Sequence, residues 1–184
     1  ILQEHNARAT FFVLGNRVDN FPNIIQREYS QGHEIGSHSF SHPQITTLTS
    51  DEIEYQFAET EHRIQQYVPY TTKLVRPPYG QITQSLKEVL QKTFVLWSID
   101  TQDWKTRDKD AIVSGVLNNV KDGDIILMHD MYSTTADACE ELIPALIERG
   151  YQLVTVSELL NAKEITPVAG SVYSRVLSTG NAAS

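Results

Sequence analysis

Short apolar runs alternate with helix-forming segments along most of this chain, and this alternation constrains its fold more than any other feature. The runs are rich in β-branched and aromatic residues and end in glycine, proline or polar residues, as buried strands do. The expected strands are residues 10–14, 33–36, 73–75, 93–97, 125–128 and 151–156. The expected helices are residues 22–29, 49–68, 83–91, 108–120, 135–149 and 157–160. This order predicts an α/β fold with a parallel sheet and helices outside it.

Polar side chains that are capable of catalysis or metal binding follow four of these strands. They are His38 and His42, Arg76 and Tyr79, Asp100 and Asp103, and His129 and Asp130. Parallel barrel enzymes build their active sites at the carboxyl ends of their strands. The alternation alone does not separate a barrel from an open sheet, but four polar strand ends favour a (β/α) barrel.

Composition limits the partners that this chain can bind. The net charge is −8 over 184 residues, which argues against nucleic acid, because that partner needs a concentrated basic face. The length suits one compact domain. Cys139 is the only cysteine, so no internal disulfide can form. Residues 161–184 are small and polar, and we expect a C-terminal tail there with one added edge segment near Val172 and Tyr173.

His38 and His42 are four positions apart. On one helical turn this spacing places both imidazoles on one face, where they can bind one divalent metal ion. Histidines with this spacing are more often surface or capping residues, but a buried strand precedes this pair and Pro43 follows it. A catalytic metal typically has three protein ligands, and two histidines with a carboxylate suit zinc or another first-row divalent ion. The candidates for the third ligand are Asp100, Asp103, His129, Asp130 and a residue upstream of Ile1.

His129 is a candidate general acid for a leaving amine or alcohol. A neighbouring carboxylate favours the protonated imidazole that this role requires. Asp100 and Asp103 are the candidates for that carboxylate, and helix capping or turn formation is the alternative role for both.

Arg76 stands at a strand end, before a rigid turn that contains two prolines. An arginine in this position is well placed to orient a buried carboxylate. The backbone N–H of Tyr79 in the same turn could face a developing oxyanion. Trp104 either lines a small apolar pocket or belongs to the core.

Five segments, in order along the chain, resemble the motifs of the polysaccharide deacetylase family, also called the NodB-homology domain. They are residues 10–15 (TFFVLG), 38–42 (HSFSH), 76–80 (RPPYG), 100–104 (DTQDW) and 127–130 (LMHD). The resemblance implies a distorted (β/α) barrel with parallel strands. It also implies that residues 1–160 form a catalytic domain that needs one divalent metal ion, with zinc first and cobalt, nickel or manganese as alternatives.

The resemblance implies a role for each candidate residue. His38 and His42 would bind the metal. His129 would be the general acid, with Asp103 as its carboxylate partner.

The remaining candidates would act on the substrate or the base. Tyr79 would contact the substrate and donate its backbone N–H to the oxyanion. Arg76 would brace the catalytic base. Trp104 and Leu127 would form the apolar pocket for the acetyl methyl group.

The first motif of the family, T-F-D-D-G-P, is absent from these 184 residues. In the family its first aspartate is the general base and its second is the third metal ligand. Residues 1–4 resemble the end of a helix that would follow this motif, so we expect the motif, and the first strand of the barrel, upstream of Ile1. The catalytic domain would then be N-terminally incomplete, either as a fragment, which we favour, or as a natural truncation.

The expected activity is removal of N-acetyl groups from a carbohydrate polymer. Residues 76–80 and 172–175 are closest in appearance to Gram-positive peptidoglycan N-acetylglucosamine deacetylases, which implies an extracellular or cell-surface location. The expected partner is an acetylated glycan polymer or oligomer, with no protein partner beyond a missing N-terminal fragment. The alternatives are an inactive carbohydrate- or wall-binding module, a chitooligosaccharide deacetylase and an acetylxylan esterase.

Overall fold

The computed structural model describes residues 1–177 in two compact units. The five-strand unit consists of residues Thr10–Leu96 and Thr166–Tyr173. The two-strand unit consists of Ile1–Ala9, Trp97–Ile165 and, among the described residues, 174–177. The expected division of the chain into a domain of residues 1–160 and a tail of residues 161–184 stays a prediction, and part of that tail lies outside the described residues.

The five-strand unit contains a sheet with the strand order β1-β2-β3-β4-β7, in which every neighbouring pair is parallel. Its strands are β1 (Thr10–Val13), β2 (Glu34–Ser37), β3 (Leu74–Val75), β4 (Thr93–Val95) and β7 (Val172–Tyr173). Its helices are α1 (Gly15–Val18), α2 (Pro22–Ser30), α3 (Ser50–Gln65) and α4 (Gln84–Leu90), with 3-10 turns at Ile45–Thr47 and Pro78–Gly80. The edge segment expected near Val172 is therefore present as β7, which pairs with β4.

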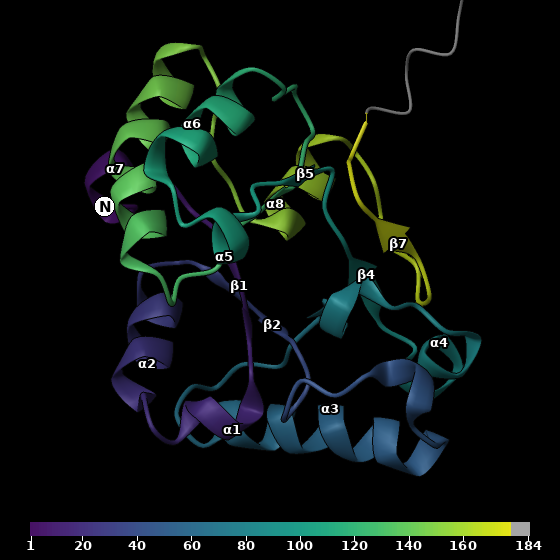
Figure 1. Ribbon diagram of the computed structural model, residues 1–184. Helices are drawn as coiled ribbons and strands as arrows, with labels where there is room; N and C mark the ends of the chain where they lie inside the picture. Colours follow the sequence, from purple (N-terminus) through teal and green to yellow (C-terminus); the bar gives the residue numbers. More distant parts are fainter. Residues whose placement is uncertain (178–184) are drawn as a thin grey trace, which may run out of the picture. The chain divides into compact units, whose positions relative to one another are not determined.

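Helix α3 packs against α1 and α4 and covers the strands of its unit (Figure 1). A capping box starts this helix, since the Thr49 hydroxyl and the Glu52 carboxylate each accept a hydrogen bond from the other residue's backbone N–H. The buried residues of α3 recur at helical spacing, so one stripe of the helix faces the core. These residues are Ile53, Phe57, Thr60 and Ile64.

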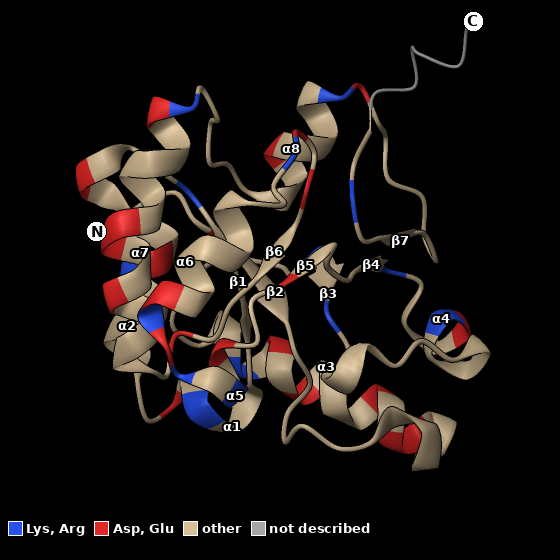
Figure 2. Ribbon diagram, turned by 45° about the horizontal axis from the view of Figure 1, so that its top comes forward, with Lys and Arg blue, Asp and Glu red and all other residues tan. Residues whose placement is uncertain are grey.

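The two-strand unit contains one parallel pair, β5 (Ile99–Asp100) with β6 (Ile126–Leu127). Its helices are α5 (Asp103–Thr106), α6 (Lys109–Leu117), α7 (Ser133–Glu148) and α8 (Val156–Ala162), with a 3-10 turn at Gln3–His5. The apolar faces of α6 and α7 pack on each other around Ile112, Val116 and Leu142, which are at most 2% exposed. Acidic residues are numerous on α3 and α7 (Figure 2).

One expected strand is absent and one unexpected strand is present. Residues 151–156 do not form a strand; at the end of this segment the hydroxyl of Thr155 accepts a hydrogen bond from the Glu158 N–H and caps α8, which includes Val156. The short strand β5 was not expected, since its two residues carry too little periodicity to be recognised. No helix within residues 1–177 is long and apolar enough to cross a membrane.

Gly15→Ala should destabilise the fold, because a Cβ atom there would lie 2.7 Å from Phe40 Cδ2 and from Thr60 Oγ1. Overpacking of this kind costs about 1–3 kcal/mol. Gly115→Ala is the matched control: its Cβ atom on α6 would meet nothing within 4 Å, and it should add about 0.5–1 kcal/mol of helix stability. Urea unfolding of both variants measures the two effects, and equal stability of the two would contradict the close packing at Gly15.

Candidate functional site

His38 and His42 lie in a loop, which we call the histidine loop (residues 38–42), directly after β2. The expected helical turn is wrong, because Ser39 (φ 73°) and His42 (φ 60°) both adopt left-handed backbone conformations. The loop nevertheless brings the two imidazoles together. Their ring centroids are 4.9 Å apart and their planes are inclined at 68°.

The ring of His38 is fixed by a backbone carbonyl. Its Nδ1 lies 2.5 Å from the carbonyl oxygen of Arg76, and a carbonyl only accepts, so Nδ1 carries the proton. The lone pair is then on Nε2, where it can bind a metal ion. Metal-binding histidines commonly have an outer-shell hydrogen bond of this kind, which sets the tautomer and the ring orientation.

The imidazoles of His38 and His42 fit part of a metal site. The chain provides two neighbouring imidazoles, and one of them has its tautomer fixed for ligation. Within residues 1–177 no group of three or more His, Cys, Asp and Glu side chains could hold a metal ion. The histidine loop could therefore provide two ligands of a metal site, and two imidazoles suit a divalent first-row metal.

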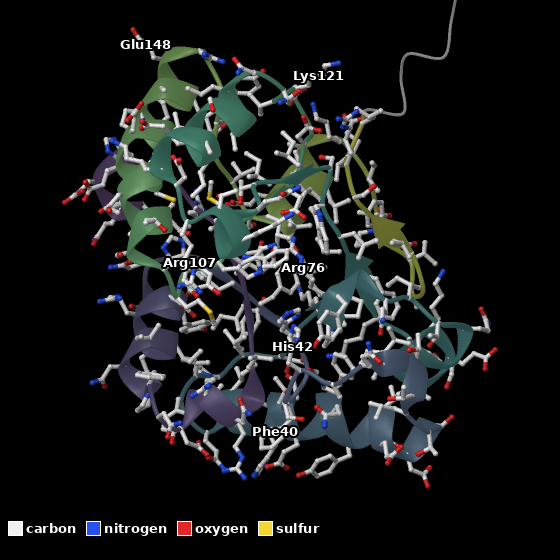
Figure 3. The ribbon with its side chains drawn as sticks, viewed as in Figure 1. Phe40, His42, Arg76, Arg107, Lys121 and Glu148 are labelled. Carbon is white, nitrogen blue, oxygen red and sulfur yellow. The ribbon has the colours of Figure 1, made fainter. Side chains whose placement is uncertain are left out.

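Arg76 is almost fully buried, with 8% of its surface exposed. Its guanidinium donates to the carbonyls of Leu96 (3.1 Å) and Val95 (3.4 Å) and lies 4.3 Å above the centroid of the Phe12 ring. Burial lowers the pKa of Arg76 to about 10. These contacts fix the arginine beside the carboxyl ends of β3 and β4. In the view of Figure 3, His42 lies between Arg76 and Phe40.

Tyr79 has a strained backbone (φ 57°) in the 3-10 turn Pro78–Gly80. The N–H groups of Gly80 and Gln81 donate to the carbonyls of Pro77 and Pro78, and the N–H of Tyr79 makes no such bond within the turn. Early N–H groups of helical turns generally lack a partner inside the turn. The ring of Tyr79 is exposed and meets the His42 ring edge-on, with centroids 4.7 Å apart, so this N–H and the histidine loop belong to one neighbourhood.

In the two-strand unit, Asp103 is the partner of His129. The Asp103 side chain is fully buried, and its Oδ1 lies 2.7 Å from His129 Nδ1. Its Oδ2 accepts from the His129 N–H (2.6 Å) and from the hydroxyl of Thr135 (2.9 Å). With Nδ1 occupied by Asp103, Nε2 is the atom of His129 that remains for proton transfer.

Hydrogen bonding lowers the pKa of the Asp103 carboxyl. Burial alone would raise it, but the hydrogen bonds from His129 and Thr135 outweigh burial and bring the pKa below the usual 3.8. The ionised carboxylate is therefore favoured, and it orients the imidazole.

The other sequence candidates have different surroundings. Asp100 is exposed and accepts from the Gln102 N–H (2.9 Å), which is a turn contact. Asp130 is exposed. Leu127 is buried in β6. Trp104, the second residue of α5, is 49% exposed.

The sequence did not point to three residues that surround the candidate site residues. Thr135 bonds to Asp103, Tyr132 lies with its ring centroid 6.5 Å from that of His129, and Gln56 bonds to the histidine loop. All three lie outside the recognised motifs. No local sequence pattern singles out any of the three.

The sequence pattern of the family described as "Polysaccharide deacetylase" matches residues 1–95, which is more than half of the chain. The chain belongs to the polysaccharide deacetylase family. The family expected from the five motifs is thereby confirmed.

Two curated relatives act on peptidoglycan according to their names. Peptidoglycan-N-acetylmuramic acid deacetylase PdaC of Bacillus subtilis is 44% identical over 163 residues, which cover 89% of this chain and 35% of that protein. Peptidoglycan-N-acetylglucosamine deacetylase PgdA of Listeria monocytogenes is 38% identical over 162 residues, covering 88% of this chain and 35% of that protein. The chain thus spans about a third of the length of these relatives.

Solved structures of relatives have the same fold. The structure of a family 4 acetyl xylan esterase from Clostridium thermocellum, in complex with a cobalt ion, superposes with a TM-score of 0.90. Its sequence is 35% identical, and the match covers 95% of this chain and 88% of that one. The expected α/β fold with parallel strands is confirmed.

The stability of the protein should fall in acid because of Asp103. A carboxyl whose pKa is lower in the folded state stabilises the fold above its unfolded-state pKa, and this contribution is lost as the pH falls through the folded-state pKa. Asp103→Asn should lower the free energy of unfolding at pH 7 by about 2–3 kcal/mol, since an amide NH2 would then face hydrogen-bond donors.

The same substitution should flatten the dependence of stability on pH between about pH 5 and 2. Urea unfolding over this pH range measures both effects. Asp100→Asn, at an exposed turn, is the control and should change little. Parallel pH profiles for wild type and Asp103→Asn would show that the pKa of Asp103 is not lowered.

Proposed function

We propose that this chain is part of a metal-dependent hydrolase that removes N-acetyl groups from a carbohydrate polymer, with peptidoglycan N-acetylglucosamine as the first candidate substrate. Family membership and the names of the two peptidoglycan deacetylases support this proposal. The observation that carries it is the His38 ring, which the Arg76 carbonyl holds through Nδ1 beside the His42 ring, so that the lone pair of the His38 ring is on Nε2.

The cofactor in this proposal is one divalent cation, with zinc first. His38 and His42 would hold it together with a third protein ligand, as is typical of catalytic sites. When bound, such a cation polarises an acyl oxygen and increases the acidity of a water molecule. The cobalt ion in the acetyl xylan esterase structure supports a divalent metal in the family.

The residues of this chain would have distinct roles in the reaction. His129 would donate its Nε2 proton to the leaving amine, while the Asp103 carboxylate holds the ring in position. The Tyr79 N–H would donate to the developing oxyanion. Arg76 would orient the carboxylate base that deprotonates water, and we assign that base to none of the described residues.

Substrate contacts and location belong to the same proposal. Trp104 and Leu127 would enclose the acetyl methyl group. Since the candidate substrate is a wall polymer, we propose an extracellular or cell-surface location. Protease accessibility on intact cells measures this, and full protection there would contradict it.

The alternative functions differ in what they would release. A chitooligosaccharide deacetylase or an acetylxylan esterase would release acetate from another acetylated polymer. A carbohydrate-binding module without activity would bind glycan and release none, and the two-ligand histidine loop is the feature that favours it.

His42→Ala should weaken metal binding strongly, because it removes one of two imidazole ligands. We expect the dissociation constant for Co²⁺, measured by absorption spectroscopy against a competing chelator, to increase at least about tenfold. His62→Ala is the control, since His62 is exposed on α3, outside the histidine loop. Equal Co²⁺ affinity of His42→Ala and the wild type would exclude the histidine loop as the metal site.

The activity itself is tested by acetate release from acetylated peptidoglycan, chitooligosaccharide and xylan, with the whole gene product and added Zn²⁺ or Co²⁺. We expect release from peptidoglycan. His129→Gln should lower kcat by about 10²–10⁴-fold, because the leaving amine loses its proton donor. Glycan binding without acetate from any of the three polymers would favour the binding module.

A further inference from the structure

Gln56 of α3 is the side chain that connects this helix to the histidine loop through hydrogen bonds. Its Oε1 accepts from the backbone N–H of Phe40 (3.0 Å) and from that of Ser41 (2.9 Å). Its Nε2 donates to the hydroxyl of Ser41 (3.0 Å). Phe40 and Ser41 lie between His38 and His42, so one amide group contacts the middle of the segment that carries both imidazoles.

The orientation of the Gln56 amide is determined by its partners. Two backbone N–H groups only donate, so the carbonyl oxygen of the amide must face them. Each of these N–H groups would otherwise need water or another acceptor, because a loop with left-handed residues cannot pair them within regular secondary structure. Gln56 therefore provides the acceptor that a neighbouring strand would otherwise provide for these two N–H groups.

The histidine loop needs external support because its backbone is strained. Ser39 and His42 both have positive φ values, which cost free energy and persist only where the surroundings hold them. Two carbonyls of the loop, those of Ser39 and Phe40, accept from the first N–H groups of α1. The His42 N–H donates to the Ser39 hydroxyl (3.0 Å), and Gln56 satisfies the two N–H groups that remain in between.

Helix α3 is a rigid base for this contact. Ile53, three positions before Gln56, and Phe57, directly after it, are buried in the core, and the capping box fixes the start of the helix. The Phe40 ring meets the Tyr55 ring of the same helix, with centroids 6.0 Å apart. The histidine loop is thus held against α3 by the hydrogen bonds of Gln56 and by the contact between the Phe40 and Tyr55 rings.

We propose that Gln56 is a positioning residue for the metal site: by holding the Phe40 and Ser41 N–H groups it fixes the backbone between His38 and His42, and with it the relative placement of the two imidazoles. This inference rests on the proposed metal-binding role of the histidine loop. It gives Gln56 no contact with the metal or the substrate.

The test compares three variants of Gln56 with a control on the same helix. Gln56→Leu and Gln56→Ala remove the acceptor, whereas Gln56→Glu keeps an acceptor oxygen in the place of the amide oxygen. Gln65→Ala is the control, since Gln65 bonds to Glu61 and Thr71 and not to the histidine loop. All are made in the full chain.

The first measurement is amide hydrogen exchange by NMR without metal, which reports local opening residue by residue. We expect exchange at Phe40 and Ser41 to accelerate about tenfold or more in the Leu and Ala variants, and to return toward wild type in Gln56→Glu. The core amides of α3 should keep their protection in all variants. Unchanged exchange at Phe40 and Ser41 in Gln56→Leu would overturn the proposal.

The second measurement is the dissociation constant for Co²⁺. Loss of an outer-shell contact typically weakens metal binding about 10- to 100-fold, and we expect this for Gln56→Leu and Gln56→Ala at an unchanged melting temperature. Gln56→Glu and Gln65→Ala should stay within about twofold of wild type. Wild-type affinity in Gln56→Leu, or equal losses in Gln56→Leu and Gln65→Ala, would overturn the positioning role.

A wild-type protein that binds no Co²⁺ would count against the proposed function and against the positioning of a metal site. The exchange data would then still decide whether Gln56 holds the loop. The two failures are therefore distinguishable.

Discussion

The alignment of β2 with β3 determines where the candidate metal site forms. Ser37 pairs with Val75 in parallel strands, so the residues that follow them, His38 and Arg76, leave the sheet side by side. The Arg76 N–H donates to the Ser37 carbonyl (3.0 Å), and the Arg76 carbonyl meets His38 Nδ1. A shift of one residue would turn each side chain to the other face of the sheet and separate this pair. The register of β2 and β3 thus determines that His38, the first candidate ligand, carries its proton on Nδ1.

A buried carboxylate organises the two-strand unit in a comparable way. Four donors converge on Asp103: the His129 ring and N–H, the Thr135 hydroxyl and the Trp104 N–H. Charge-assisted hydrogen bonds are stronger than neutral ones, and an ionised group in a buried position needs them. They join the start of α5, the segment after β6 and the start of α7. The same contacts that stabilise these three segments therefore orient the candidate general acid.

Local patterns in the sequence determined the class of fold and the location of the polar segments. Strand and helix periodicity and the Thr49–Glu52 capping box depend on neighbours within a few residues, so they can be recognised without a structure. The same local reasoning was wrong for residues 151–156, which form no strand and whose last two residues cap and begin α8. It was also wrong about a helical turn at His38 and His42, where sheet and helix contacts impose left-handed backbone.

Only the tertiary structure decided which groups meet. The sequence offered both Asp100 and Asp103 as partners of His129, and the fold pairs Asp103 across 26 positions and adds Thr135 across 32. It also brings Gln56 to Ser41 across 15 positions. No local pattern encodes these pairings, because they depend on where packed strands and helices end. The sequence by itself therefore determined which residue types stand at the strand ends, and the packing of the chain decided which of their atoms are close enough to act together.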